Sequence, residues 1–378
     1  MIFVLLFFEA LILLYGAAHL GLGPYEAKIV FSNPLYHFLY LLFADEVFVR
    51  LPNIFLTLIN IFLFYRLATL YLNRKRDALL ATLLFALLPA TIGSAVVINK
   101  APFLLFLTLL FLILYHVRPV YGYVLAVVML FVDHSFAVLF LAMALWGLYA
   151  RKFEAIFFAG LFVASLILFG FDTGGKPKSY FLDTFAVFAA IFSPLLFLYF
   201  FYAIYRVLLK ERKDPVWFVS ATAFFFSLAL SFRQRISLID FAPFAVVGVI
   251  VTVRVFTHSL RVRIRRHRKR LYLYLFLVVA VLLLNDALLL FHQRLFFLLS
   301  PKKHFAYRHY LGKLLAQELR KRGYGCLEAP ESLAYQLRFY GIKSCPNARL
   351  ALKPRSGAKK ISLRFHDRDF GVFYVVPQ

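Results

Sequence analysis

Residues 271–291 have the sequence LYLYLFLVVAVLLLNDALLLF, an almost wholly apolar run. A helix needs about twenty predominantly apolar residues to cross the hydrocarbon core of a bilayer, so this run predicts a transmembrane helix. Directly after it the composition changes, and basic and polar residues become frequent. The run therefore predicts a border between a transmembrane domain at 1–291 and a small soluble domain at 292–378.

The same length criterion, applied to the rest of the chain, predicts an all-α polytopic membrane protein of about 11 transmembrane helices. Hydrophobic residues make up 63% of the 378 residues and charged residues only 16%, and the mean hydropathy is +0.80. A soluble domain cannot bury that much apolar surface, whereas lipid accepts it. The spans are predicted at 1–20, 52–72, 78–97, 101–116, 120–132, 135–150, 155–171, 184–205, 215–231, 236–256 and 271–291.

The stretch 121–148 decides how these helices are oriented, because Asp133 and His134 interrupt it. If it forms two helices, the loops on one face carry 18 Lys or Arg residues in total and the opposite loops carry 7. A single helix would move several basic clusters to the sparsely charged face, so the positive-inside rule favours two helices. It also predicts a multi-pass protein of the cytoplasmic (inner) membrane, with a cytoplasmic N-terminus and an extracytoplasmic C-terminal domain.

The formal net charge of +25 does not indicate a nucleic-acid partner, although strongly basic proteins often have one. The basic residues cluster between apolar runs and in the tail, which is typical of determinants of membrane topology. We therefore expect a lipid bilayer as partner and no nucleic acid.

The C-terminal tail shows the patterns of a small α/β domain. It favours amphipathic helices at 304–323 and 330–341 and short strands at 348–352, 360–365 and 371–376. The only cysteines, Cys326 and Cys345, both lie there. An oxidising compartment favours a disulfide between them, and two free thiols are the alternative. The sequence has no CxxC, no HExxH and no GxxxxGK[ST], so it shows no recognisable metal site, and no ATP-driven pump motif.

Charged residues at the predicted outer ends of the spans are the candidate site, because a charge near lipid is costly. Carboxylates can serve as general bases, and Arg and Lys can hold a phosphate and stabilise its charge as it leaves. The acidic candidates are Glu26, Asp45, Glu46 and Asp133, and the basic candidates are Arg50, Lys100, Arg233 and Arg235.

Residues 23–68, GPYEAKIVFSNPLYHFLYLLFADEVFVRLPNIFLTLINIFLFYRLA, resemble the first outer loop and second span of the GT-C superfamily. More narrowly, they are similar to the polyprenyl-phosphate-sugar transferases that include protein mannosyltransferases and the lipid A aminoarabinose transferase. The elements that carry the resemblance are Tyr25–Glu26, 33–36 (NPLY) and 49–52 (VRLP). Residues 87–89 (LLP) and 232–244 (FRQRISLIDFAPF) resemble further elements of the family, and the resemblance covers roughly residues 1–250.

The resemblance implies a glycosyltransferase that moves a sugar from a polyprenyl-phosphate donor to an acceptor glycan, lipid or protein. It implies Glu26 as the catalytic base and Arg233, Arg235, Lys100 and Arg50 as phosphate-binding residues. The family usually has Asp-Glu where this chain has Tyr25–Glu26, so Asp45, Glu46 or Asp133 could replace the missing acid. The lipid-linked sugar is the implied donor, and no resident cofactor is implied; a divalent metal requirement stays open.

Besides a glycan polymerase or ligase, which would have its main loop late in the chain and not early as here, two other classes of protein compete with this interpretation. A transporter or flippase would favour internal hydropathy repeats and discontinuous spans in corresponding halves, and the sequence shows no such repeat. A non-catalytic membrane member of the same family is the second alternative, since the usual acidic pair is incomplete. The long early loop and the soluble tail favour the enzyme.

Overall fold

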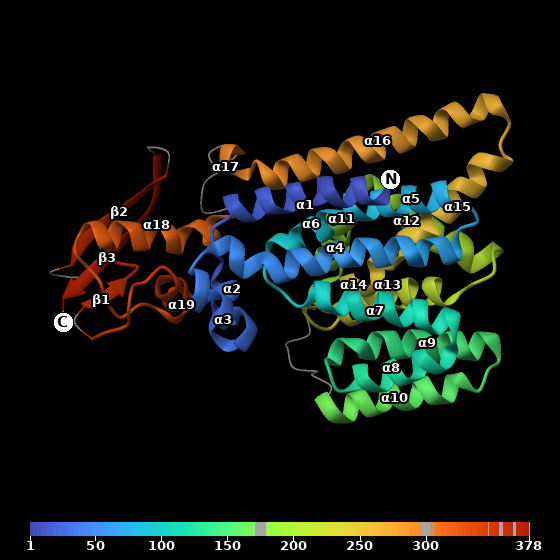
Figure 1. Cartoon of the computed structure of the whole chain (residues 1–378), viewed down its shortest axis with the longest axis horizontal. Helices are drawn as coiled ribbons and strands as arrows, with labels where there is room; N and C mark the ends of the chain where they lie inside the picture. The colour runs from blue at the N-terminus through green and yellow to red at the C-terminus, as the bar shows by residue number, and fades with distance from the viewer. Residues whose placement is uncertain are drawn as a thin grey trace. The chain divides into compact units, whose positions relative to one another are not determined.

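A computed structural model of the chain describes residues 1–170, 179–295, 304, 306–346, 348–354, 358–365 and 368–377, which are mostly helical (Figure 1). The chain divides into two compact units that are both discontinuous in sequence. Unit 1 comprises Met1–Ala10, Phe55–Ala95 and Lys100–Asp286, and unit 2 comprises Leu11–Ile54, Val96–Asn99 and Ala287–Gln378. One unit border thus lies near the predicted border at 291, but the first loop groups with the tail and not with the transmembrane domain.

Four described helical segments are long and apolar enough to cross a membrane, and each matches a predicted span. They are α1 (Ile2–His19), α4 (Glu46–Tyr71), the segment Ala242–Val262, and His267–Leu290 within α16 (Arg265–Leu290). The segment Ala242–Val262 consists of α14 (Ala242–Ala245), η3 (Val246–Gly248) and α15 (Val249–Val262).

Two predicted spans, 78–97 and 184–205, are each broken into a bent pair of helices. The first pair, α5 (Lys75–Ala86) and α6 (Pro89–Val96), bends by 54°, and the second, α11 (Phe181–Phe192) and α12 (Pro194–Lys210), bends by 106°. Proline explains both breaks, because it disfavours the helical conformation of the residue before it and cannot donate a backbone hydrogen bond. Ser193, which precedes Pro194, is not helical, with φ 70° and ψ 139°.

The prediction of about 11 transmembrane helices is not supported. By length and composition, the described residues contain four such helices, or up to six if each bent pair is one span. The remaining predicted spans form apolar helices that fall short of the usual crossing length. These are α7 (Ala101–Val117), α8 (Pro119–Leu130), α9 (Ala137–Ala150), α10 (Glu154–Phe169) and α13 (Pro215–Ser231).

The interruption at Asp133 and His134 does divide the stretch 121–148 into two helices, as the charge distribution predicts. Helix α8 ends at Leu130, and the short 3₁₀ helix η1 (His134–Phe136) leads into α9. The Asp133 side chain accepts a hydrogen bond from the Ser135 backbone N–H, so it caps η1. Helices α9 and α10 pack against each other within unit 1.

Phenylalanine builds much of the core of unit 1. The rings of Phe64 and Phe85 stack with centroids 4.2 Å apart, and those of Phe192 and Phe200 with centroids 4.5 Å apart. All four side chains are buried. Aromatic pairs of this kind contribute roughly 0.5–1.5 kcal/mol beyond the area that they bury. The many phenylalanines therefore stabilise contacts between helices inside a medium that is itself apolar.

Unit 2 combines the first loop with the C-terminal tail. The loop forms α2 (Pro24–Ser32) and α3 (Pro34–Phe43), and the tail contributes α17 (His292–Leu295), α18 (Tyr307–Lys321) and α19 (Glu331–Phe339). Helix α19 packs on α2 within the unit. Gln336 Nε2 donates to the carbonyl of Leu22 over 2.6 Å, and the Leu22 N–H donates to Tyr340 Oη over 3.0 Å. The tail therefore packs against the loop, while α18 also packs on α19 and β2 within the tail.

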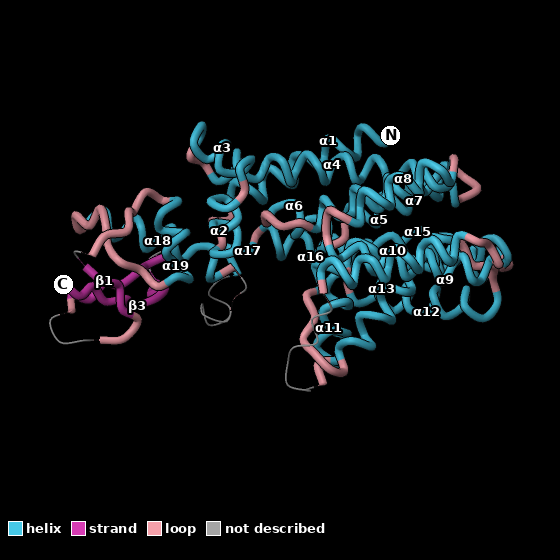
Figure 2. Tube along the Cα trace, turned by 90° about the horizontal axis from the view of Figure 1, so that it is seen from below, coloured by secondary structure: helices cyan, strands magenta, loops and turns pink. Residues whose placement is uncertain are grey.

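The three predicted strands are confirmed as one antiparallel sheet in the order β1-β3-β2 (Figure 2). The strands are β1 (Ala348–Ala351), β2 (Lys359–Phe365) and β3 (Arg368–Pro377). Alternate side chains, including Ile361, Leu363, Phe373 and Val375, are buried. This period-2 burial is the pattern that distinguished strands from helices in the sequence.

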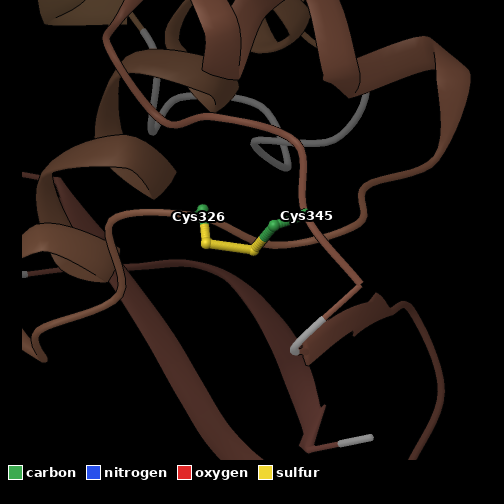
Figure 3. The surroundings of a disulfide bond; sticks show 2 residues. All are labelled: Cys326 and Cys345. Carbon is green, nitrogen blue, oxygen red and sulfur yellow. A yellow bond between two sulfur atoms is a disulfide. The ribbon is translucent and has the colours of Figure 1, made fainter.

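Cys326 and Cys345 form a disulfide, which settles the choice that the sequence left open (Figure 3). Their Cα atoms are 5.5 Å apart and their separation in sequence is 19. Closing a loop of this length restricts the unfolded chain and stabilises the folded one by about 3 kcal/mol.

Replacing both cysteines with serine is therefore expected to lower the free energy of unfolding of the tail by about 3 kcal/mol. The measurement is denaturant unfolding of the purified protein in detergent, compared with wild type under oxidising conditions. Cys326→Ser alone should show the same loss, because one replacement already removes the crosslink. An unfolding curve unchanged by either substitution would contradict this account.

Candidate functional site

Glu26 closes the N-terminal end of α2. Pro24 suits the first turn of a helix, where its missing N–H leaves no hydrogen bond unmade. The Gly23 N–H donates to Glu26 Oε2 over 2.7 Å, and the Ile98 N–H donates to Oε1 over 2.9 Å. Backbone groups thus engage both carboxylate oxygens of a side chain that is only 1% exposed.

Arg50 forms a bidentate pair with the same carboxylate. Its Nε lies 3.1 Å from Glu26 Oε1 and its Nη2 lies 3.0 Å from Oε2. The guanidinium also donates to the carbonyl oxygens of Ala17, Leu20 and Gly21 at the end of α1 and just after it. Because Arg50 is fully buried and its donors are used in this way, it is not placed to bind a phosphate.

His309 from α18 completes this cluster, and two glycines make room for it. His309 Nδ1 lies 3.2 Å from Glu26 Oε2. A Cβ atom at Gly21 would lie 2.4 Å from the His309 carbonyl oxygen, and one at Gly23 would lie 2.8 Å from His309 Cε1. Glycine is therefore required at position 21, where the clash is with backbone, whereas a side chain at position 23 would displace the His309 ring.

The predicted role of Glu26 as general base does not fit these contacts. Burial opposes ionisation of Glu26, but the charge of Arg50 and the hydrogen bonds from His309 and Arg50 outweigh it and lower the pKa to about 2. A carboxylate with so low a pKa and with both oxygens engaged is a poor proton acceptor near neutral pH. We assign Glu26 and Arg50 to holding the first loop in place.

This pKa gives a pH dependence of stability. The folded pKa of about 2 lies below the ordinary value of 4.5, so the contribution of Glu26 is fully present above pH 4.5. It is lost as the pH falls from 4.5 towards 2, and it amounts to about 3 kcal/mol. Unfolding measured across this range should show the loss in wild type and a smaller loss in Glu26→Gln. Equal slopes for the two proteins would count against the assignment.

The auxiliary acids of unit 2 also have structural partners. Asp45 Oδ1 accepts from the Val47 N–H over 2.7 Å at the start of α4. Glu46 Oε1 accepts from Tyr340 Oη over 2.8 Å and pairs with Lys313 Nζ at 2.9 Å. Glu46 therefore helps to bind the tail to the loop.

A second charged cluster, in unit 1, joins Lys100, Asp133, Ser135 and Asp240, and we call it the Lys100 cluster. Lys100 immediately precedes α7, and its carbonyl accepts the N–H groups of Phe103 and Leu104. Its Nζ lies 3.0 Å from both Asp133 oxygens, 2.7 Å from Asp240 Oδ1 and 3.1 Å from Ser135 Oγ. One ammonium thus contacts two carboxylates from different parts of the chain.

Unlike the Glu26 pair, the Lys100 cluster is accessible. The Lys100 side chain is 34% exposed, that of Asp133 21% and that of Asp240 16%. His134 lies at the edge of the cluster, with Nδ1 3.4 Å from Asp133 Oδ1 and Nε2 3.9 Å from Asp240 Oδ1. A polar substrate can therefore reach these charged groups, because they are partly exposed.

The cluster is charged at neutral pH. Burial favours neutral Lys100, but hydrogen bonds to Asp240 and Asp133 and their charges outweigh it and raise its pKa. Burial likewise favours neutral Asp133, but hydrogen bonds from Ser135 and the charge of Lys100 lower its pKa. Lys100 and Asp133 therefore form a charged pair within the cluster.

The Lys100 cluster adjoins a pocket of about 210 Å³ within unit 1. Asp240, in the 3₁₀ helix η2 (Leu238–Asp240), lines the pocket together with His134, Gln234 and Arg235. Its other walls are mainly apolar, and they include Val138, Phe162, Leu166, Phe169, Phe226 and Leu230. Of the predicted phosphate-binding residues, Arg235 lines this pocket and Arg233 is exposed. In the ranges described above, no carboxylate pairs with either arginine.

The predicted site residues therefore fall into two groups. Glu26, Asp45, Glu46 and Arg50 belong to unit 2, and Lys100, Asp133, Arg233 and Arg235 belong to unit 1. Sequence reasoning missed Asp240, although it lies inside the segment 232–244 that carries part of the family resemblance. The sequence could have indicated Asp240, because it lies five residues after Arg235 and both are near the beginning of the predicted span 236–256.

Comparisons of the chain with protein-family models, with curated proteins and with solved structures found no match.

Proposed function

We propose that this chain is a membrane glycosyltransferase that moves a sugar from a polyprenyl-phosphate donor to an acceptor outside the cytoplasm. The observation that carries the proposal is the pocket of unit 1, in which apolar walls meet the polar side chains of Asp240, His134 and Arg235. A polyprenyl-phosphate sugar has the same two parts, an apolar chain and an anionic head carrying a polar sugar. The pocket suits the head and the first isoprene units.

The Lys100 cluster supplies groups for the transfer. Asp240, the carboxylate that lines the pocket, accepts the proton of the acceptor hydroxyl or amide. The acceptor atom then forms a bond to the anomeric carbon, and the bond from that carbon to the phosphate oxygen breaks. Its electron pair leaves on the polyprenyl phosphate, whose charge Arg235 and Arg233 offset. Lys100 holds Asp133 and Asp240 in position.

Other observations support the membrane setting and the orientation. Several apolar helices suit a bilayer, and the disulfide in the tail suits an oxidising compartment outside the cytoplasm. The resemblance of residues 23–68 and 232–244 to polyprenyl-phosphate-sugar transferases supports the class of donor.

Arg235→Ala is expected to weaken binding of polyprenyl phosphate by at least about tenfold, because a hydrogen bond to a charged group contributes roughly 1.5–3 kcal/mol. Binding to the purified protein in detergent is measured with a fluorescent polyprenyl phosphate. Arg118→Ala, an exposed arginine that does not line the pocket, is the matched control and should bind as wild type does. If the Arg235→Ala and wild-type proteins bind polyprenyl phosphate with equal affinity, the pocket is not its binding site.

A transporter or flippase is the competing function, and the fate of the donor separates the two. Purified protein in liposomes is incubated with a polyprenyl-phosphate sugar and an extract of cell-envelope acceptors. A transferase releases polyprenyl phosphate and attaches the sugar to an acceptor, and this reaction should be lost in Asp240→Asn. A flippase moves the donor between leaflets and leaves it intact, and that result would refute the proposal.

A further inference from the structure

The Lys100 cluster includes three potential metal ligands. Asp133, His134 and Asp240 each offer one ligand atom, and these atoms all lie within 4.8 Å of one another. Carboxylate and imidazole groups at such separations are the donors that divalent ions use in proteins. Geometry alone therefore makes this position a candidate for a divalent cation.

The Lys100 ammonium already lies among these ligands. Its Nζ contacts both oxygens of Asp133 and Oδ1 of Asp240 at distances of 2.7–3.0 Å. A divalent ion bound to the same oxygens would stand about 2.0–2.6 Å from each of them. It would therefore come into contact with the ammonium, and two cations at that distance repel strongly in a partly buried site.

The surrounding structure holds the ammonium in this place. The Lys100 backbone is fixed where α7 begins, by hydrogen bonds from Phe103 and Leu104 to its carbonyl. Ser135 Oγ adds a fourth oxygen at 3.1 Å from Nζ, and the Ser135 N–H orients Asp133. Displacing the ammonium would leave two carboxylates facing each other across the cluster.

We propose that the Lys100 ammonium is the resident cation of the Asp133–Asp240 site, in the place where a divalent ion would otherwise bind. Wild-type protein then takes no divalent ion there, and removing the ammonium turns the cluster into a site for Mn²⁺ or Mg²⁺. The catalytic consequence, sugar transfer that does not need added metal, rests on the function proposed above. The binding consequence does not depend on that function.

The test uses full-length protein purified in detergent, with Mn²⁺ alone as the probe and bound ion counted by electron paramagnetic resonance. Four proteins are compared: wild type, Lys100→Ala, Lys100→Arg and the double variant Lys100→Ala/Asp240→Asn. We expect Lys100→Ala to bind one Mn²⁺ per chain, at least about 100-fold more tightly than wild type. Lys100→Arg keeps the positive charge and should behave as wild type, and the double variant should lose the gain.

Two results would overturn the inference. One is a wild-type protein that binds one Mn²⁺ per chain and loses it on Asp240→Asn. The other is a Lys100→Ala protein that elutes as a monodisperse species with wild-type helix content and yet binds no more Mn²⁺ than wild type. A poorly folded Lys100→Ala protein is replaced by Lys100→Met, whose side chain keeps most of the lysine volume. If the proteins bind Mn²⁺ as expected but the wild type transfers no sugar, the proposed function is refuted and the inference about Lys100 still holds.

Discussion

Arg50→Ala is expected to lower the free energy of unfolding by about 3–5 kcal/mol, the usual cost of removing one partner of a buried ion pair. The substitution leaves the Glu26 carboxylate, which is 1% exposed, without its bidentate partner. It also removes the donors that satisfy the carbonyl oxygens of Ala17, Leu20 and Gly21. Unpaired buried polar groups are costly, so both effects act in the same direction.

Denaturant unfolding of the purified protein measures this change. Arg233→Ala, which removes an exposed arginine, is the matched control and should change the free energy by no more than about 0.5 kcal/mol. A cycle of Glu26→Gln, Arg50→Ala and the double variant then isolates the coupling between the two side chains. If Arg50→Ala is as stable as Arg233→Ala, the buried pair does not hold the first loop.

Asp240→Asn is expected to slow sugar transfer by about 10²–10⁴-fold, the typical contribution of a general base. Asparagine has nearly the same shape as aspartate, and it can still accept a hydrogen bond from Ser135 Oγ, which lies 2.9 Å from Asp240 Oδ1. It cannot take up the acceptor proton at neutral pH. The fold should therefore survive while the rate falls.

Glu26→Gln is the informative comparison for this rate, because sequence resemblance assigns the base to Glu26. Per folded molecule, Glu26→Gln should transfer sugar at close to the wild-type rate, since Glu26 is buried and paired with Arg50. Rates are normalised to the fraction of protein that elutes as a folded species. If Asp240→Asn transfers sugar at the wild-type rate and Glu26→Gln does not transfer it, the general base is Glu26 and not Asp240.

Local patterns allowed much of the tail to be predicted from the sequence. Alternation of apolar residues gave the three strands, and helical periodicity gave α18 and α19 to within a few residues at each end. The break between α8 and α9 was also predictable, because Asp133 is costly inside an apolar helix and can cap η1. In each case the deciding signal lies within a few residues of the element itself.

The number of spans could not be predicted in this way. Apolar composition shows that a segment suits lipid, but it does not show where a helix bends or ends. Pro89 and Pro194 divide two apolar stretches that hydropathy treats as continuous. Prolines at the starts of α7, α8 and α13 likewise set the beginnings of helices that are shorter than a usual crossing.

The division of the site residues depended on contacts distant in sequence. Glu26 and Arg50 are 24 residues apart, and Ser135 and Asp240 are 105 apart. Nothing in the local sequence around Glu26 shows that Arg50 neutralises it, or that His309 from the tail lies 3.2 Å away. The sequence pattern therefore singled out charged residues, but it could not distinguish a buried structural pair from an accessible cluster.

The central claim, lipid-linked sugar transfer at the Lys100 cluster, is tested most directly by mass spectrometry of surface glycans and envelope lipids. Cells lacking the gene are compared with the same cells expressing wild-type protein or Asp240→Asn at equal membrane abundance. We expect the deletion and Asp240→Asn cells to lack the same sugar and to accumulate its polyprenyl-phosphate donor, and wild type to restore it. An unchanged profile in the deletion cells, or full restoration by Asp240→Asn, would contradict the account.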